Sequence, residues 1–151
     1  AMKLPRVARG IISADIDRDG DLDVLLTINN GVPVLLRNDA APSSPPNNAL
    51  RLTLVGTKSN RSAIGATVEA QLQTPGQTLK EVVRGMVKSG SSYLSQSELP
   101  LTLGLGQQTE VTDLIIHWPS GKQTQLHNVG ANQALTIDED RGIIQKQPLS
   151  H

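Results

Sequence analysis

The sequence predicts an all-β protein: a small β-meander around an acidic loop, followed by an antiparallel β-sandwich or barrel of about seven strands. Three observations favour this fold class. Apolar and polar residues alternate in at least five segments after residue 50, which is the period of half-buried strands. Turn sequences rich in glycine and proline separate these segments. No stretch has the 3.6-residue period of an amphipathic helix.

Residues 6–38 form the predicted meander. Two apolar runs, "VLLTI" and "VPVLL", are joined by Asn29, Asn30 and Gly31, and an Asn-Gly pair favours a tight hairpin because both residues accept a positive φ. The segment "VARGIISA" at residues 7–14 predicts a third strand before the acidic loop. The acidic loop therefore connects two strands of the meander.

Residues 39–47 contain three prolines and several small residues, a composition typical of an extended linker. Residues 48–140 form the predicted β domain, and residues 141–151 are expected to be a frayed tail. Alternation places one face of each strand in the core. The expected core residues are Leu50, Leu52, Leu54, Ala66, Val68, Ala70, Leu72, Leu101, Leu103, Leu105, Leu114, Ile116 and Trp118. Lys80, Arg84 and Lys88 share the opposite, charged face of their segment.

Composition excludes several classes of protein. The formal charge is zero and aromatic residues are scarce, so no basic surface with interleaved aromatics favours nucleic-acid binding. No apolar run approaches the roughly 18 residues of a membrane span. The chain has no cysteine, which excludes disulfides and thiolate zinc sites.

Five aspartates occupy alternate positions of "DIDRDGDLD" at residues 15–23. Alternate side chains of a tight loop can converge on one cation, and an all-oxygen ligand set favours Ca²⁺. Gly20, at the sixth position, allows a sharp turn. The expected metal ligands are Asp15, Asp17, Asp19, Asp21 and Asp23, with Asp21 contributing its backbone carbonyl and Asp23 closing the site. The twelfth position is Leu26, within a strand, so the loop is not an EF-hand.

The stretch "ADIDRDGDLDVLLTINNGVPVLLRND" resembles FG-GAP/VCBS-type repeats, which are blades of calcium-binding β-propellers. Four later stretches resemble the ASPIC/UnbV domain, which follows such repeats in cartilage acidic protein-like and bacterial proteins. They are "LVGTKSNRSAIGATV" (54–68), "YLSQSELPLTLGLG" (93–106), "LIIHWPSGK" (114–122) and "VGANQALTIDE" (129–139).

These resemblances imply a calcium-binding, non-enzymatic interaction or adhesion module in a secreted, periplasmic or cell-surface setting. One blade cannot close a propeller, so the chain is expected to be the C-terminal part of a larger β-propeller protein. The free edge of a lone blade would be covered by the following domain, paired with a second copy in a homodimer, or left exposed. The partner would be a protein or a glycan.

Two other functions stay open at this point. A carbohydrate-binding accessory domain of an exported enzyme would use Tyr93 in "GSSYLSQS", or Trp118, as a stacking platform; the alternatives are a hydrogen-bonded β-arch and a buried core residue. An uncharacterised hydrolase would need His117 or His127 beside a carboxylate. These two histidines are expected to lie roughly opposite each other across the "WPSG" hairpin. Arg61 could contact a ligand, although hydrogen bonds from Ser59 and Asn60 to the backbone are the favoured explanation of its loop.

Overall fold

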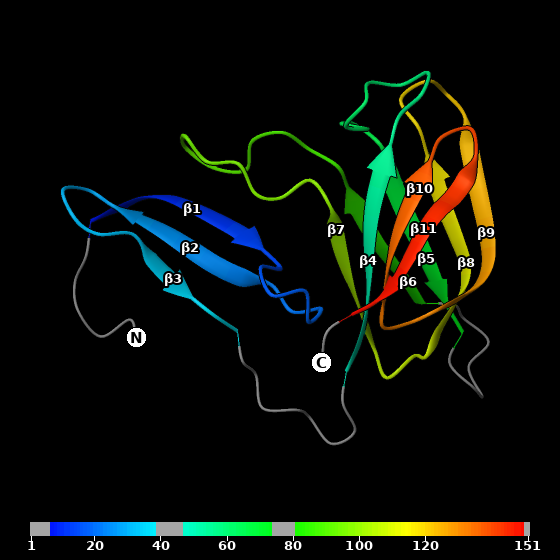
Figure 1. Ribbon diagram of the computed structural model, residues 1–151, viewed down its shortest axis with the longest axis horizontal. Helices are drawn as coiled ribbons and strands as arrows, with labels where there is room; N and C mark the ends of the chain where they lie inside the picture. Colours follow the sequence, from blue (N-terminus) through cyan, green and yellow to red (C-terminus); the bar gives the residue numbers. More distant parts are fainter. Residues whose placement is uncertain (1–6, 39–46, 74–80, 150–151) are drawn as a thin grey trace.

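The structure is a computed structural model that describes residues 7–38, 47–73 and 81–149 (Figure 1). It is all-β, and among the described residues 57 % lie in strands and none lies in a helix. Eleven strands form one three-stranded and two four-stranded sheets. The strands are β1 (Ala8–Ala14), β2 (Asp23–Ile28), β3 (Val34–Leu36), β4 (Asn48–Val55), β5 (Thr67–Leu72), β6 (Glu81–Met86), β7 (Leu101–Gly106), β8 (Glu110–His117), β9 (Gln123–Gly130), β10 (Gln133–Asp138) and β11 (Gly142–Pro148).

The predicted meander is the antiparallel sheet β1-β2-β3, and the acidic loop connects β1 to β2 as expected. The hairpin from β2 to β3 is looser than predicted. Asn30 has a positive φ of 54° but Gly31 does not, and the last paired residues are Leu26 and Val34. Pro33 has no amide hydrogen to donate, which ends the ladder before the turn.

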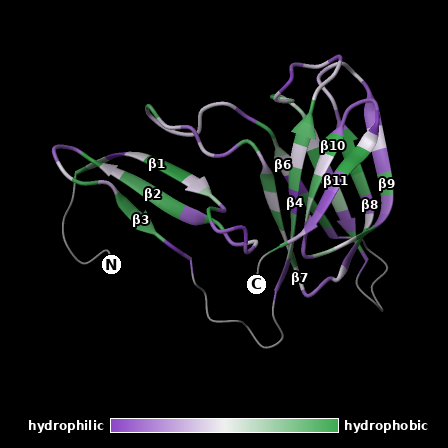
Figure 2. Cartoon of the chain, in the orientation of Figure 1, coloured by the Kyte–Doolittle hydropathy of each residue, from purple (hydrophilic) through white to green (hydrophobic). Residues whose placement is uncertain are grey.

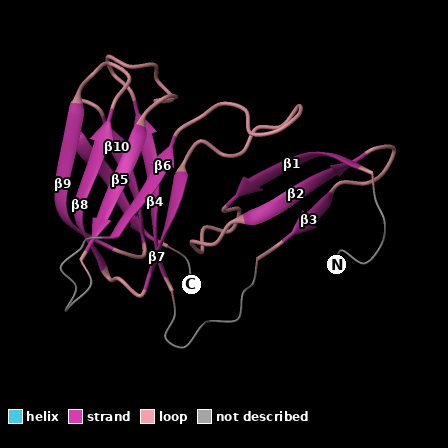
Figure 3. Ribbon diagram, turned by 180° about the vertical axis from the view of Figure 1, so that it is seen from behind, coloured by secondary structure: helices cyan, strands magenta, loops and turns pink. Residues whose placement is uncertain are grey.

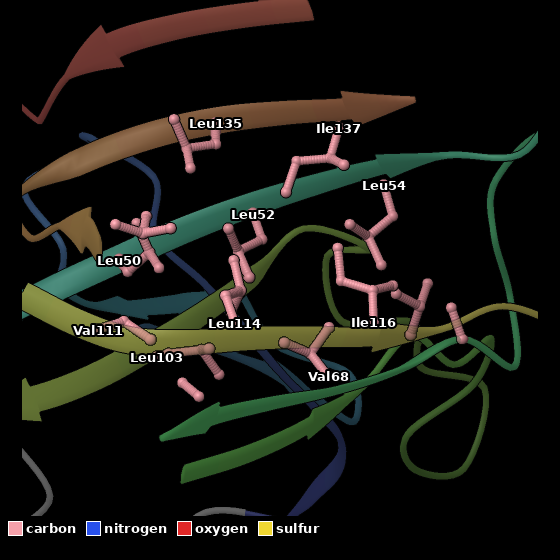
Figure 4. Packing of buried hydrophobic residues seen from close by; sticks show 14 of the residues in the cluster. Leu50, Leu52, Leu54, Val68, Leu103, Val111, Leu114, Ile116, Leu135 and Ile137 are labelled. Atoms are coloured by element: carbon pink, nitrogen blue, oxygen red, sulfur yellow. The ribbon is translucent and has the colours of Figure 1, made fainter. Parts of the chain in front are cut away.

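The β domain is a sandwich of the sheets β11-β10-β4-β7 and β6-β5-β8-β9. Apolar side chains on the inner faces of both sheets form one core, in which Leu52 and Ile137 face Leu114 and Ile116 (Figure 4). Strand alternation predicted these buried positions. With no Phe in the chain, the core is built from aliphatic residues and Trp118, each large side chain contributing about 1.5–3 kcal/mol by its burial.

Two features of the sandwich differ from the sequence-based expectation. β4 pairs with β10 in parallel, so the sandwich is not wholly antiparallel. The expected frayed tail contains β11, which pairs with β10, and Leu149 is buried after it. Local alternation does not specify which strands pair, and the exposed residues of β11 give no core signal.

The three-stranded sheet lies beside the sandwich, with the acidic loop and the connection from β6 to β7 between them (Figures 1 and 3). This connection joins the two sandwich sheets as the predicted β-arch, and Ser92 and Ser95 form an isolated bridge within it. Its later part runs along β1, where Glu98 N–H donates to Ser13 C=O and Ser13 N–H donates to Ser97 Oγ. Apolar residues alternate with polar ones along both units (Figure 2).

Some sequence-based expectations concern residues that the structure does not describe. The predicted linker lies almost wholly outside the described residues, as does Lys80. Arg84 and Lys88 are exposed, as the charged face of their segment predicts.

Candidate metal centre

Two residues of the acidic loop between β1 and β2 have a left-handed backbone conformation. Arg18 has φ 63° and Gly20 has φ 98°. Gly20 is also pressed against the sandwich, because a Cβ atom there would lie 2.9 Å from Ala49 Cβ and 3.1 Å from Leu149 Cδ1. Glycine is therefore required at this position both by the backbone conformation and by close packing.

Three of the five aspartates converge in the structure. One carboxylate oxygen from each of Asp15, Asp17 and Asp19 lies within 4.8 Å of the others. Asp15 is buried, Asp19 is half-buried and Asp17 is exposed. A group of this kind presents hard oxygen ligands from one side of the loop, with solvent access at Asp17.

Asp15 is the unusual member of this cluster, because only 3 % of the residue is exposed. Its Oδ2 atom lies 3.2 Å from Arg51 Nη1, close enough for an ion pair but without a well-aligned hydrogen bond to either oxygen among the described residues. Burial raises the pKa of Asp15 above its ordinary value, against the opposing effects of the Arg51 charge and the Gly20 amide. Oδ1 has no cationic partner in the described residues.

Asp21 and Asp23 are placed differently. Asp21 is exposed, and its N–H donates to Asp19 Oδ1 at 2.9 Å, which tightens the loop. Asp23 is buried, and its carboxylate accepts hydrogen bonds from the N–H groups of Ile16 (3.1 Å) and Asn38 (2.8 Å). The Asp23 carboxylate therefore ties the start of the acidic loop to the segment after β3.

Arg51 and Glu98 connect the acidic loop to the sandwich. Glu98 Oε1 accepts hydrogen bonds from Asp15 N–H and Arg51 Nη1, both at 2.8 Å, while Arg51 Nη2 donates to Glu98 Oε2. Arg51 also donates to Thr102 Oγ1. Sequence analysis missed this role of Arg51 and Glu98. The only available signal was that Arg51 occupies an outward position between two buried leucines.

A second buried carboxylate, Glu139, was also missed. Its Oε2 atom accepts three backbone N–H bonds, from Thr57, Lys58 and Ser59, at 2.7–2.8 Å. Burial raises the pKa of Glu139, but the hydrogen bonds from the Ser120 hydroxyl and from these amides outweigh burial and lower it to about 2. Every oxygen is satisfied, so Glu139 pins two loops together and offers no vacant ligand position.

The histidines are not opposite each other, contrary to the expectation. His117 pairs with Gln123, and His127 pairs with Asp113, because the turn after β8 is shorter than an opposed histidine pair would require. Four residues along a strand separate the two positions, about 13 Å. His127 Nδ1 lies 2.7 Å from Asp113 Oδ1 on an exposed surface.

The remaining candidates divide between structural and exposed residues. Trp118 is 3 % exposed and its indole N–H donates to Thr124 Oγ1. It is therefore a buried core residue and not an exposed stacking platform. Asn60 hydrogen-bonds to the Ile64 backbone in both directions, which supports the structural interpretation of its loop. Tyr93 and Arg61 are exposed.

Comparison with known proteins identifies one family. The family model described as ASPIC and UnbV matches residues 56–144, which spans the sandwich from the loop after β4 into β11. The matched region does not include the three-stranded sheet or the acidic loop. No curated protein matches the chain. The described residues include no helix with the length and apolar character needed to cross a bilayer.

Proposed function

Because the chain belongs to the ASPIC and UnbV family, whose domains occur in extracellular and adhesion-type proteins, we propose that it is a non-enzymatic, calcium-stabilised interaction module. In this proposal the sandwich is the ASPIC/UnbV domain. The acidic loop binds Ca²⁺, and the bound ion fixes the three-stranded sheet against the sandwich.

The buried carboxylate of Asp15 is the observation on which the calcium site rests. A buried ionised group without full compensation is costly, and a divalent cation beside Oδ1 would provide that compensation. The carboxylates of Asp17 and Asp19 are close enough to share the same ion. Oxygen donors of this type suit Ca²⁺ better than zinc or copper.

Asp15, Asp17 and Asp19 are the proposed side-chain ligands. Asp21 contributes its backbone carbonyl and Asp23 adds a carboxylate oxygen in the same proposal. The ion supplies charge neutralisation and cross-linking of the loop. An affinity of roughly 10⁻⁴–10⁻³ M, common for extracellular modules, would keep the site loaded outside the cell.

We further propose that residues 6–38 are a partial FG-GAP/VCBS-type blade from the C-terminal end of a larger propeller, in a secreted, periplasmic or cell-surface protein. The order β1-β2-β3 and the calcium-type loop between β1 and β2 support this assignment. Edge strand β3 offers its backbone to a neighbouring blade, or to a second copy of the chain in a homodimer. The proposed binding partner is a protein or a glycan.

The two alternative functions have less support. Stacking of a neutral sugar on Trp118 is disfavoured by the burial of that residue. A hydrolase would need a concave site around a histidine. No histidine lines the polar cavity beside Arg18 and Arg51, or a second cavity beside Ser97 and Glu98, in the described structure. His127, which is exposed, pairs with the half-buried Asp113 across strands β8 and β9, outside both of these cavities.

Calorimetric titration of the calcium-free protein with Ca²⁺ tests the metal site. Wild-type protein should release or absorb heat with one-to-one stoichiometry, and Asp17→Asn should weaken binding at least about 10-fold by removing one charged ligand. Asp140→Asn, which removes an exposed carboxylate outside the loop, is the matched control. An absence of both heat and thermal stabilisation at millimolar Ca²⁺ would exclude the site.

A further inference from the structure

A polar cavity of about 390 Å³ lies between the acidic loop and the outer face of the sheet β11-β10-β4-β7. This volume falls in the range of small-molecule binding pockets, about 300–1,000 Å³. Its lining combines Arg18 from the loop with residues of β4, β10 and β11. Both units of the chain therefore contribute to it.

The register of the strands builds the floor of this cavity. Thr53 pairs with Thr136, which pairs with Gln145, so three polar side chains form one row across the sheet. Arg51 begins the neighbouring row, which runs through Ala134 to Gln147. The neighbours of Thr53 and Thr136 in their strands are buried leucines and isoleucines, so alternation directs the two hydroxyl groups outward. Gln145 pairs directly with Thr136 and therefore shares this outer face.

The charges in the cavity favour an anion. The lining contains two arginines and no acidic residue. Arg51 is already paired with Asp15 and Glu98, whereas no described carboxylate forms an ion pair with Arg18. Arg18 also adopts a left-handed φ of 63°, a conformation that costs an ordinary residue about 1–2 kcal/mol. Arg18 therefore has a strained backbone and a side-chain charge without an ion-pair partner in the described residues, and it lines the cavity. Backbone strain of this kind is common at residues that contact a ligand.

We propose that this cavity binds a small carboxylate bearing several hydroxyl groups, such as a sugar acid. The guanidinium of Arg18 pairs with the carboxylate, and Thr53, Thr136, Gln145 and Gln147 hydrogen-bond to the hydroxyls. The lining includes no aromatic side chain on which a neutral sugar could stack, so the charge is essential for affinity. The cavity lining includes none of the calcium ligands, although Arg18 lies between Asp17 and Asp19 in the same loop. The proposed contacts to the sugar acid do not require a bound ion.

Titration with sodium glucuronate, followed by calorimetry and by amide chemical shifts, tests this site. Glucuronate should bind and shift the amide signals of Thr53, Thr136 and Gln145, while glucose and acetate should each bind at least about 10-fold more weakly, since a charge-assisted hydrogen bond contributes about 1.5–3 kcal/mol. Arg18→Asn should weaken glucuronate binding by about 10- to 100-fold. Asparagine is chosen because it tolerates a left-handed φ.

Two further variants keep the result interpretable. Thr136→Val removes one hydroxyl from the sheet without touching the loop, and should weaken binding about 2- to 10-fold. Arg61→Asn removes an exposed arginine outside the cavity and should leave binding unchanged. The titrations are repeated in EDTA and in millimolar Ca²⁺, so that failure of the calcium site is separate from failure of this one. No glucuronate binding in either condition, equal binding of glucose or acetate, or unchanged binding by both cavity variants would overturn the assignment.

Discussion

The Nη1 atom of Arg51 lies 3.2 Å from Oδ2 of Asp15, and both side chains are almost completely buried. Arg51 lies on the outer face of the central strand β4 of the sandwich, whereas Asp15 begins the acidic loop. Glu98 accepts hydrogen bonds from both residues and completes the connection. This cluster of charged groups joins the three-stranded sheet to the sandwich.

Arg51→Met should loosen this contact. Removing one partner of a buried ion pair leaves Asp15 and Glu98 uncompensated, at a cost of about 3–5 kcal/mol. Hydrogen exchange should accelerate in residues 8–28 and 95–98 while the sandwich core stays protected. Arg84→Met removes an exposed arginine paired with Glu69 and is the control. Equal exchange in the two variants would contradict a docking role for Arg51.

Calcium should stabilise the protein in proportion to its concentration. Free Ca²⁺ at 100 times its dissociation constant would add about 2.7 kcal/mol to the free energy of unfolding. Asp17→Asn should lose most of the increase in Tm. Asp21→Asn should keep it, because Asp21 is exposed and is proposed to contribute its carbonyl. Differential scanning fluorimetry in a Ca²⁺ series measures both, and loss of stabilisation in Asp21→Asn alone would reverse the proposed roles.

Glu139→Gln should destabilise the sandwich near neutral pH. The pKa of Glu139 is lowered from 4.5 to about 2 in the folded protein, so its stabilising effect is complete above about pH 4.5. That contribution is lost as the pH falls from about 4.5 to about 2. The difference in unfolding free energy between wild type and variant should therefore shrink over this interval. Glu110→Gln, at an exposed position, is the control, and a pH-independent difference would contradict the mechanism.

Leu114→Ala should cost about 2–5 kcal/mol of stability, because Leu114 is completely buried between the two sheets. Ile144→Ala removes an exposed aliphatic side chain from edge strand β11 and should stay within about 0.5 kcal/mol of wild type. Urea denaturation measures both variants. A similar loss in both would mean that β11 is covered by a partner in solution.

The edge strand β3, which pairs only with β2 among the described residues, should support concentration-dependent dimerisation. Leu35 is half-exposed in this three-residue strand, and Leu35→Lys would place a charge on the edge. Light scattering after size-exclusion chromatography should show a higher mass at high concentration for wild type but not for the variant. A monomer at every concentration would contradict the homodimer and leave the edge for another blade.

Much of the fold could be predicted from local pattern. The buried faces at Leu50–Leu54 and at Val68–Leu72 follow from alternation, since successive strand residues point to opposite sides of a sheet. The β1-loop-β2 connection follows from the position of the aspartates between two apolar runs. Which strands pair could not be predicted from local pattern. The parallel pairing of β4 with β10 and the presence of β11 depend on contacts between distant segments.

The candidate site shows the same division. The aspartate spacing indicated the loop, and three of its five carboxylates do gather. Their unequal burial, and the use of Asp23 to hold Asn38, could not be inferred because each depends on what packs against the loop.

The sequence by itself determined the all-β class, the alternating core and the acidic loop, because these depend on the chemistry of neighbouring residues. Only the tertiary structure decided that Asp15 is buried beside Arg51, that Glu98 lies against a residue 83 positions earlier, and that Arg18 faces a polar cavity. The physical reason is that burial and charge pairing depend on which surfaces meet. Segments far apart in the chain supply those surfaces, and the local sequence of one segment does not indicate which other segment it will contact.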